Sequence, residues 1–239
     1  MNIDILVFAS HPDDIELTCA GTIISHIKKG YKVAIVDLTQ GELGTRGTAK
    51  TRLEEANLAA QIMGISTRIN LGLKDGFFSN DKENQMPVIK AIRQLRPKMV
   101  LANAIYDRHP DHGRGARLIA DSCFLAGLKK VETDDAEGKT QEPWRPFIVY
   151  NYIQDRYIKP DLIVDITPFW NKKLEAINAF KSQFFDPTST ENQTYISSPT
   201  FLPFIEARAR EFGHAIGVEF GEGFTVERTP GVKDLFDLI

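Results

Sequence analysis

The chain has 239 residues, of which 42% are apolar and 26% are charged, and its net charge at pH 7 is −3. A chain of this length forms one large domain or two small ones and needs no disulfide or metal to complete its core. With 29 basic residues against 32 acidic ones, the composition argues against a general nucleic-acid or membrane-surface binder. Its two cysteines, the absence of a long apolar run and the lack of a basic signal-like start lead us to expect a soluble cytoplasmic protein with reduced thiols.

The first half of the chain alternates between strand patterns and helix patterns. Helical spacing of apolar residues predicts helices over 15–29, from Thr51 to about Met63 with a capping box at Thr51-Arg52-Leu53-Glu54, and over Met86–Leu95. Short apolar runs predict strands, which are Ile3–Ala9, Tyr31–Leu38, Arg68–Leu71 and Met99–Ala102. The alternation predicts an α/β fold, a Rossmann-like three-layer sandwich with a mostly parallel sheet and helices on both faces.

The second half of the chain continues with fewer clear signals. A helix is expected from residue 112 to about Gly127, and the later elements are strands at Phe147–Ile153 and Leu162–Ile166 and helices at Pro168–Phe180 and about Thr200–Phe212. Residues 186–200 are rich in Ser, Thr, Pro and Asn, which predicts a long loop and suggests a lid. The apolar end of the chain, from Leu235, is expected to dock on its own domain more readily than to form an interface. Without repeats or a linker, residues 1–239 are expected to form a single domain.

Two short polar clusters contain three of the five histidines. His11-Pro12-Asp13-Asp14 directly follows the first predicted strand, and Asp107-Arg108-His109-Pro110-Asp111-His112 comes soon after the strand that ends near Ala102. In an open parallel sheet, ligands bind outside the carboxyl ends of the strands. One histidine and one carboxylate from the first cluster, with one histidine from the second, would make a His₂–carboxylate site, which is a ligand set of catalytic zinc.

Each cluster also has a purely structural interpretation. Asp13 and Asp14 can simply complement the dipole at the start of a helix, and the second cluster can be a solvated loop that opens the next helix. The combination favours a functional site, because both clusters follow strands that are expected at the same edge of the sheet. His26 and His214 fall in predicted helices, where ordinary surface or packed imidazoles are expected.

The two clusters closely resemble the paired motifs of the PIG-L/LmbE family of zinc-dependent N-acetylglucosamine deacetylases. The resemblance covers essentially the whole chain, through strings such as Asp37-Leu38-Thr39-Gln40-Gly41-Glu42, Arg52-Leu53-Glu54-Glu55-Ala56 and Phe180-Lys181-Ser182-Gln183-Phe184. It is greatest to the branch that deacetylates N-acetylglucosaminyl malate in bacillithiol biosynthesis. It implies an enzyme that hydrolyses the N-acetyl group of such a conjugate, and homo-oligomers that are often hexamers.

The resemblance also implies how the metal and the base are arranged. His11, Asp14 and His112 would be the ligands of Zn²⁺. Two neutral imidazoles and one carboxylate leave a cation that still acidifies a bound water to a pKa near ~7. Asp13, next to a ligand but not a ligand itself, would be the general base that takes the proton from the attacking water.

Two further catalytic roles follow from the second cluster. His109, as an imidazolium, would stabilise the oxyanion or protonate the leaving nitrogen. Asp111 would hold His109 and balance its charge. One departure from the family pattern is Phe201, where some relatives place a tyrosine near the metal, although Tyr195 in the preceding loop is a possible substitute.

Candidate substrate contacts come from charged residues outside the metal set. Arg52 matches a family position associated with substrate, and its guanidinium suits a carboxylate such as malate, although a capping or surface arginine is the alternative. Asp75 is either a substrate contact or a turn residue. Arg108 is assigned to substrate binding, and with Glu42 and Arg46 it is a charged loop residue that a solvated face explains at least as well.

Several other functions remain open at this point. The site would also suit a deacetylase of another GlcNAc conjugate or of a chitooligosaccharide, or a mycothiol-conjugate-type amidase. A non-catalytic metal- or sugar-binding module is a candidate from a different class. A dinucleotide-binding version is disfavoured, because the turn after the first strand has no G-x-G-x-x-G. The expected partner is therefore a small GlcNAc conjugate, with no nucleic acid and no membrane.

Overall fold

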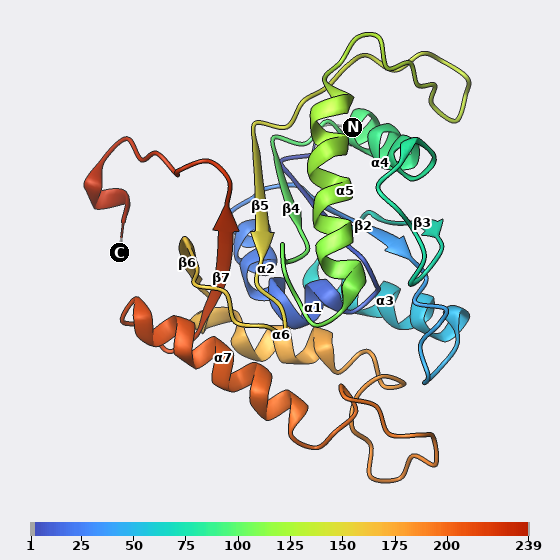
Figure 1. The fold of residues 1–239 in the computed structure, drawn as a ribbon. Helices are drawn as coiled ribbons and strands as arrows, with labels where there is room; N and C mark the ends of the chain where they lie inside the picture. Colours follow the sequence, from blue (N-terminus) through green and yellow to red (C-terminus); the bar gives the residue numbers. More distant parts are fainter. Residues whose placement is uncertain (1–2, 239) are drawn as a thin grey trace.

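A seven-stranded sheet lies at the centre of the structure, a computed structural model that describes residues 3–238 (Figure 1). Its order is β3-β2-β1-β4-β5-β7-β6, and neighbours among β1 to β5 are parallel, whereas β7 runs antiparallel to both β5 and β6. The strands are β1 (Ile5–Ala9), β2 (Val33–Thr39), β3 (Arg68–Leu73), β4 (Met99–Ala102), β5 (Ile148–Tyr152), β6 (Leu162–Asp165) and β7 (Gly221–Val226). Residues of β1 and β2 are buried along their whole length, as expected for continuous apolar strands covered on both faces. The predicted α/β fold is confirmed.

Helices cover both faces of this sheet (Figure 1). Helices α4 and α5 pack on each other over one face, in a core that includes Phe8, Ile92 and Leu118. Helices α2, α3 and α6 lie over the other face, where Val7 and Ile23 are buried. The helices are α1 (Asp14–Thr18), α2 (Ala20–Lys28), α3 (Ala49–Met63), α4 (Lys82–Leu95), α5 (Pro110–Ala126), α6 (Trp170–Ile177) and α7 (Phe201–Ala215), with 3₁₀ turns at Thr167–Phe169 and Leu235–Asp237.

Two helix starts differ from the sequence expectation. The single helix expected over 15–29 is two helices, because the chain leaves helical geometry at Cys19. Helix α3 begins one turn earlier than its predicted capping box, since Thr48 has extended backbone and its Oγ1 accepts a hydrogen bond from the Thr51 N–H at 3.1 Å. Thr48 is therefore the capping residue of this helix, and Thr51 lies inside it.

Strand β7 was not expected from the sequence. Its Gly221 and Gly223 carry no side chain to signal a strand, and the structure shows why glycine is suited to these positions. A Cβ on Gly223 would lie 2.9 Å from the Phe212 ring, and one on Gly221 would lie 2.7 Å from Ile163. Helix α7 can therefore pack closely against β7 because Gly221 and Gly223 have no side chains.

The apolar end of the chain does not dock on the domain as expected. The 3₁₀ turn near the end leaves Leu235 78% exposed and Phe236 95% exposed, and Figure 1 shows this tail leading away from β7. Cys19 and Cys123 are both buried and unpaired. Across residues 3–238, none of the helices combines the length and the hydropathy that crossing a bilayer requires.

The sheet order changes direction at β1. The chain builds β2 and β3 on one side of β1 and then returns to place β4 on the other side. The carboxyl ends of β1 and β4 thus open on a crevice at a topological switch point, which is where parallel sheets bind ligands.

Candidate active site

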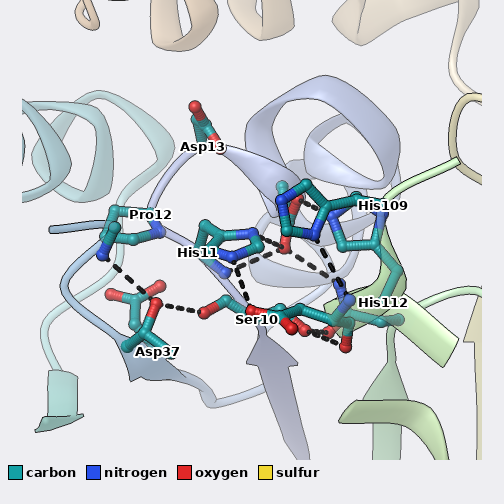
Figure 2. A network of polar contacts seen from close by, with 12 residues as sticks. Ser10, His11, Pro12, Asp13, Asp37, His109 and His112 are labelled. Carbon is teal, nitrogen blue, oxygen red and sulfur yellow. Dashed lines mark hydrogen bonds and ion pairs between the residues drawn. The ribbon is translucent and has the colours of Figure 1, made fainter. Parts of the chain in front are cut away.

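The two histidine clusters meet at the carboxyl ends of β1 and β4. The ring centroid of His11 lies 4.6 Å from that of His109 and 5.6 Å from that of His112, and the rings of His109 and His112 are 5.1 Å apart. Figure 2 shows these three imidazoles gathered together, with Asp13 on the turn beside them. The hydroxyl of Ser10, just after β1, helps to hold this arrangement, since its Oγ lies 3.1 Å from Asn103 Oδ1 and 2.9 Å from the carbonyl oxygen of Asp111.

Asp13 occupies a strained turn between β1 and α1. Its φ of +116° is rare for a residue with a side chain and costs about 1–3 kcal/mol. Arg52 from α3 secures this turn, because its Nη2 donates to the Pro12 carbonyl at 2.7 Å and to Asp13 Oδ2 at 2.8 Å. Burial raises the pKa of Asp13 to about 7, although the nearby Arg52 charge acts in the opposite direction. Asp13 therefore has the protonation behaviour of a general base that works near neutral pH.

His11 lies between two carboxylates that come from other elements. Its Nε2 is 3.0 Å from Asp75 Oδ1 and 3.3 Å from Asp111 Oδ2. Burial disfavours a charge on this ring, but the hydrogen bonds with the two carboxylates outweigh it and raise the pKa of His11 to about 10. The side chain of Asp75 is held in turn by the Leu43 N–H at 3.0 Å. This side of the site therefore stabilises a positive charge at His11.

His112 has the same kind of surroundings. Its Nε2 lies 3.0 Å from Asp14 Oδ1, and its Nδ1 lies 2.5 Å from Asp107 Oδ2. The two carboxylates outweigh the effect of burial and raise the pKa of His112 to about 9. Gln154 donates to Asp14 Oδ1 at 3.0 Å, and Asn103 donates to Asp14 Oδ2 at 2.9 Å, so both oxygens of Asp14 are oriented.

The donor set fits a divalent cation. Within residues 3–238, two triplets have ligand atoms within 4.8 Å of one another, namely His11 with His109 and His112, and His11 with Asp75 and Asp111. The expected triplet of His11, Asp14 and His112 is not one of these, although Asp14 lies 3.0 Å from His112 Nε2 and 3.7 Å from His11 Nδ1. Imidazole nitrogens and carboxylate oxygens are among the ligands that bind zinc in proteins. The identity of the ligands stays a prediction.

His109 differs from its two neighbours because its pKa is shifted in the opposite direction. Burial and the charges of His11 and His112 lower the pKa of His109 to about 4. His109 is the N-cap residue of α5, and its Nδ1 accepts a hydrogen bond from the Asp111 N–H at 3.3 Å. The acceptor role of Nδ1 leaves the proton on Nε2. In this arrangement His109 presents Nε2–H as a hydrogen-bond donor, and the expected imidazolium stays a prediction.

Asp111 supports the site differently from the expectation. It contacts His109 through its backbone N–H, whereas its carboxylate lies on His11 and also accepts from the Gly76 N–H at 2.8 Å and from Arg114 at 2.6 Å. The expectation that the Asp111 carboxylate holds His109 is corrected accordingly. The fully buried carboxylate instead connects the two clusters to the loop after β3.

The three expected substrate contacts have different surroundings. Arg52 is buried and its guanidinium binds protein groups, including the Gly41 carbonyl at 3.2 Å. The carboxylate of Asp75 likewise contacts a protein group, the ring of His11. Arg108 is partly exposed, stacks on the Tyr195 ring at 4.3 Å and lies 3.8 Å from Asp155. Of the two arginines, Arg108 is the one that a substrate can reach, since its side chain is exposed and makes no hydrogen bond within residues 3–238.

A cavity of about 390 Å³ opens beside these groups. The metal-site cluster forms one wall, and α7 forms another through Phe204, Ile205 and Arg208. The loop over 186–200 contributes Tyr195 to the lining, and Arg46 fixes this loop by donating to Ser189 Oγ at 2.9 Å and pairing with Glu191 at 3.3 Å. The loop thus lines part of the pocket, and its role as a lid stays a prediction.

Three polar residues of the site were given no role from the sequence, although Asp107 belongs to the second polar cluster. Asn103 and Asp107 follow β4, and Gln154 follows β5. Each bonds to Asp14 or His112, so they orient the expected ligands rather than add new ones. Their position at the carboxyl ends of predicted strands was the available signal, but single polar residues at strand ends are common.

Comparisons with known proteins agree on a family. The sequence profile described as "PIG-L: GlcNAc-PI de-N-acetylase" matches residues 6–123. A crystal structure of a conserved protein from Thermus thermophilus superposes with a TM-score of 0.86 at 33% identity and covers 98% of both chains. The metal-site residues expected from both clusters lie inside the matched segment.

Three curated relatives differ in their named activities. Diacetylchitobiose deacetylase of Thermococcus kodakarensis is 26% identical over 95% of this chain and 84% of that protein. A probable N-acetyl-alpha-D-glucosaminyl L-malate deacetylase 2 of Bacillus anthracis is 26% identical over 75% of this chain and 81% of the relative. A 4-oxalmesaconate hydratase of Pseudomonas putida is 28% identical over 74% of this chain and 73% of the relative. Two of these three relatives are named as deacetylases of GlcNAc-type substrates.

Proposed function

The chain belongs to the PIG-L family of enzymes, and we propose that it is a zinc-dependent N-deacetylase of N-acetylglucosaminyl conjugates. One observation carries this proposal. A buried carboxylate of raised pKa, Asp13, is held in a strained turn and lines the same cavity as His11 and His112, two imidazoles whose surroundings favour a cation. Such an arrangement suits the addition of water to an amide carbonyl.

The proposed metal ligands are His11, Asp14 and His112. When bound, Zn²⁺ lowers the pKa of a coordinated water to about 7 and polarises a carbonyl oxygen. The carboxylates of Asp75 and Asp107 contact the ring nitrogens of His11 and His112, and they fix the orientation of both rings.

Asp13 is the proposed general base. Its carboxylate accepts a proton from water as the water oxygen bonds to the acetyl carbon. Arg52 keeps this carboxylate in place by binding Oδ2, while the raised pKa provides a base that is ready to exchange protons near pH 7. The proton then returns to the amide nitrogen as the carbon–nitrogen bond breaks, so that acetate and a free amine are released.

His109 is the proposed electrophilic group. Its neutral ring presents the Nε2 proton, because Nδ1 accepts from the Asp111 N–H. A donor fixed in this way stabilises the negative charge that develops on the carbonyl oxygen during water attack. The rigid attachment of His109 at the first turn of α5 keeps this donor oriented without reorganisation.

The group attached to the glucosamine has two candidates. A neutral second sugar is favoured by the similarity to diacetylchitobiose deacetylase, which covers 95% of this chain. A malate-type carboxylate is supported by Arg108, whose guanidinium lines the cavity and is open to a ligand. The other cavity arginines, Arg46, Arg52 and Arg208, are bonded to protein groups. We place the disaccharide first and GlcNAc-malate second.

Amine release from matched substrates tests the proposal. Purified protein with Zn²⁺ is incubated with N,N'-diacetylchitobiose, GlcNAc-malate and GlcNAc, and primary amine and acetate are quantified. The proposal predicts stoichiometric amine and acetate from at least one conjugate, with a higher kcat/KM than for GlcNAc, because binding of the second group contributes to catalysis. Absence of amine release from all three, with the metal bound, would contradict it and would favour the hydratase-like or non-catalytic alternatives.

A further inference from the structure

The break between α1 and α2 leaves backbone groups without helical partners. Cys19 has φ −129° and ψ 13°, so the helix that starts at Asp14 ends at Thr18 and a new helix starts at Ala20. At such a break, the last carbonyls of the first helix and the first N–H groups of the second need other partners. Burial makes this requirement strict, because an unpaired buried polar group is costly.

A buried ion pair supplies partners to both sides of the break. Glu222 of β7 accepts from the Gly21 N–H at 3.0 Å and from the Thr22 N–H at 2.7 Å, at the start of α2. Lys173 of α6 donates to the Thr18 carbonyl at 3.3 Å, at the end of α1. The two side chains bind each other at 2.7 Å, and each is only 2% exposed.

This ion pair sets where α1 ends. Helix α1 has five residues, and a helix of this length has no stability of its own in water. Its position depends on tertiary contacts: Arg52 holds the turn before it through Asp13, Glu16 in its middle pairs with Arg68 at 2.6 Å, and Lys173 holds the carbonyl of its last residue. Asp14, a proposed metal ligand, is the first residue of this short helix.

We propose that Lys173 and Glu222 are positioning residues for the active site, because they fix the break that places Asp13 and Asp14. The pair lies on α6 and β7, far from the histidine clusters in sequence. It holds Asp14 against His112 by preventing α1 from joining α2 as one continuous helix. This inference rests on the proposed metal site and deacetylase function.

The sharpest test removes both charges at once. The double variant Lys173→Met/Glu222→Met leaves no unpaired buried charge, and replacing a buried pair by apolar side chains is often tolerated. We expect it to fold cooperatively but to bind Zn²⁺ about 10-fold to 100-fold more weakly in a chelator competition. We also expect kcat to fall about 100-fold, while KM changes much less. Lys172→Met, which breaks an exposed pair with Glu175, is the matched control and should leave both quantities unchanged.

The outcomes separate this inference from the proposed function. A folded double variant whose Zn²⁺ affinity and kcat both lie within about threefold of wild type overturns the inference, because positioning must appear in kcat. If the double variant does not fold, Glu222→Gln is judged by the same criterion, and loss of folding in both variants also overturns it. If wild type itself releases no amine, the proposed function fails, and the Zn²⁺ affinities still decide whether the pair positions the metal ligands.

Discussion

The contact between Arg52 and Asp13 changes the role that the sequence suggested for Arg52. The sequence suggested a substrate role for Arg52, but its guanidinium is directed at the Pro12 carbonyl and the Asp13 carboxylate. Asp13 itself keeps a φ of +116°, and strain of this kind persists only where the surroundings impose it. We therefore interpret Arg52 as the residue that maintains the base in its strained position.

Replacing Arg52 by lysine tests this interpretation. A lysine keeps the charge but cannot bind the Pro12 carbonyl and the Asp13 carboxylate in the same planar arrangement. We expect Arg52→Lys to lower kcat by about 10-fold to 100-fold while KM stays nearly constant, since the loss concerns the reacting geometry. Steady-state kinetics measure both. A rise of KM with an unchanged kcat would instead show that Arg52 binds substrate.

The residue scale also shows what a sequence can reveal of such a site. The His11 and His112 clusters are recognisable because their residues are adjacent in the chain and each follows a predicted strand. Gln154 contacts His112 from the loop after β5, 42 positions further along the chain, and this contact exists only after the sheet has formed. The lowered pKa of His109 also follows from its folded neighbours, and no spacing rule in the sequence could predict it.

At the scale of elements, the parallel strands were predictable, and the elements that depend on distant partners were not. Strands β1, β2 and β4 are short apolar runs in the sequence, and such runs predict buried parallel strands. Strand β7 contains two glycines that accommodate α7, and the break at Cys19 depends on Glu222, whose contact with Gly21 spans 201 positions. Local patterns cannot report a partner at that distance.

Helix α7 packs closely against the backbone that leads into β7, and we therefore expect Gly213 to be sensitive to substitution. This glycine lies in α7, and a Cβ there would meet the backbone around Glu219 at 2.7 Å. Alanine normally favours a helix, but here the backbone must shift, so Gly213→Ala should destabilise the protein by about 1–3 kcal/mol. Thermal or urea unfolding measures the change. Gly231→Ala, where nothing lies within 4 Å, is the matched control, and equal stability of the two variants would contradict the close packing.

At the scale of the whole molecule, the interior protects both thiols. Cys19 and Cys123 are buried, and burial raises the pKa of Cys123 to about 12. Since the thiolate is the reactive form, a disulfide reagent such as Ellman's reagent should react with the native protein far more slowly than with the protein in denaturant. The unfolded chain should then release two equivalents, matching its two cysteines. Rapid reaction of the native protein would show that the core opens readily.

The homo-oligomer that the family resemblance implies stays a prediction at the scale of the whole molecule. Phe77, Phe147, Leu235 and Phe236 are each at least 70% exposed, and a subunit contact would remove such apolar side chains from water. We predict a molar mass that is a multiple of the single chain in size-exclusion chromatography with light scattering. A mass equal to one chain across a wide range of concentrations would contradict this prediction.

The central claim is that Asp13 is the base of a zinc-dependent hydrolysis, and one paired measurement on Asp13→Asn tests it most directly. The amide keeps the size of the side chain but cannot accept the proton, and loss of a general base costs about 10²-fold to 10⁴-fold. We predict that the variant retains about one Zn²⁺ per chain by metal analysis, as wild type does, and that its amine release falls by this factor. We also predict that removing the metal from wild type abolishes its activity. Retained turnover in Asp13→Asn, or in wild-type protein stripped of metal, would contradict the account.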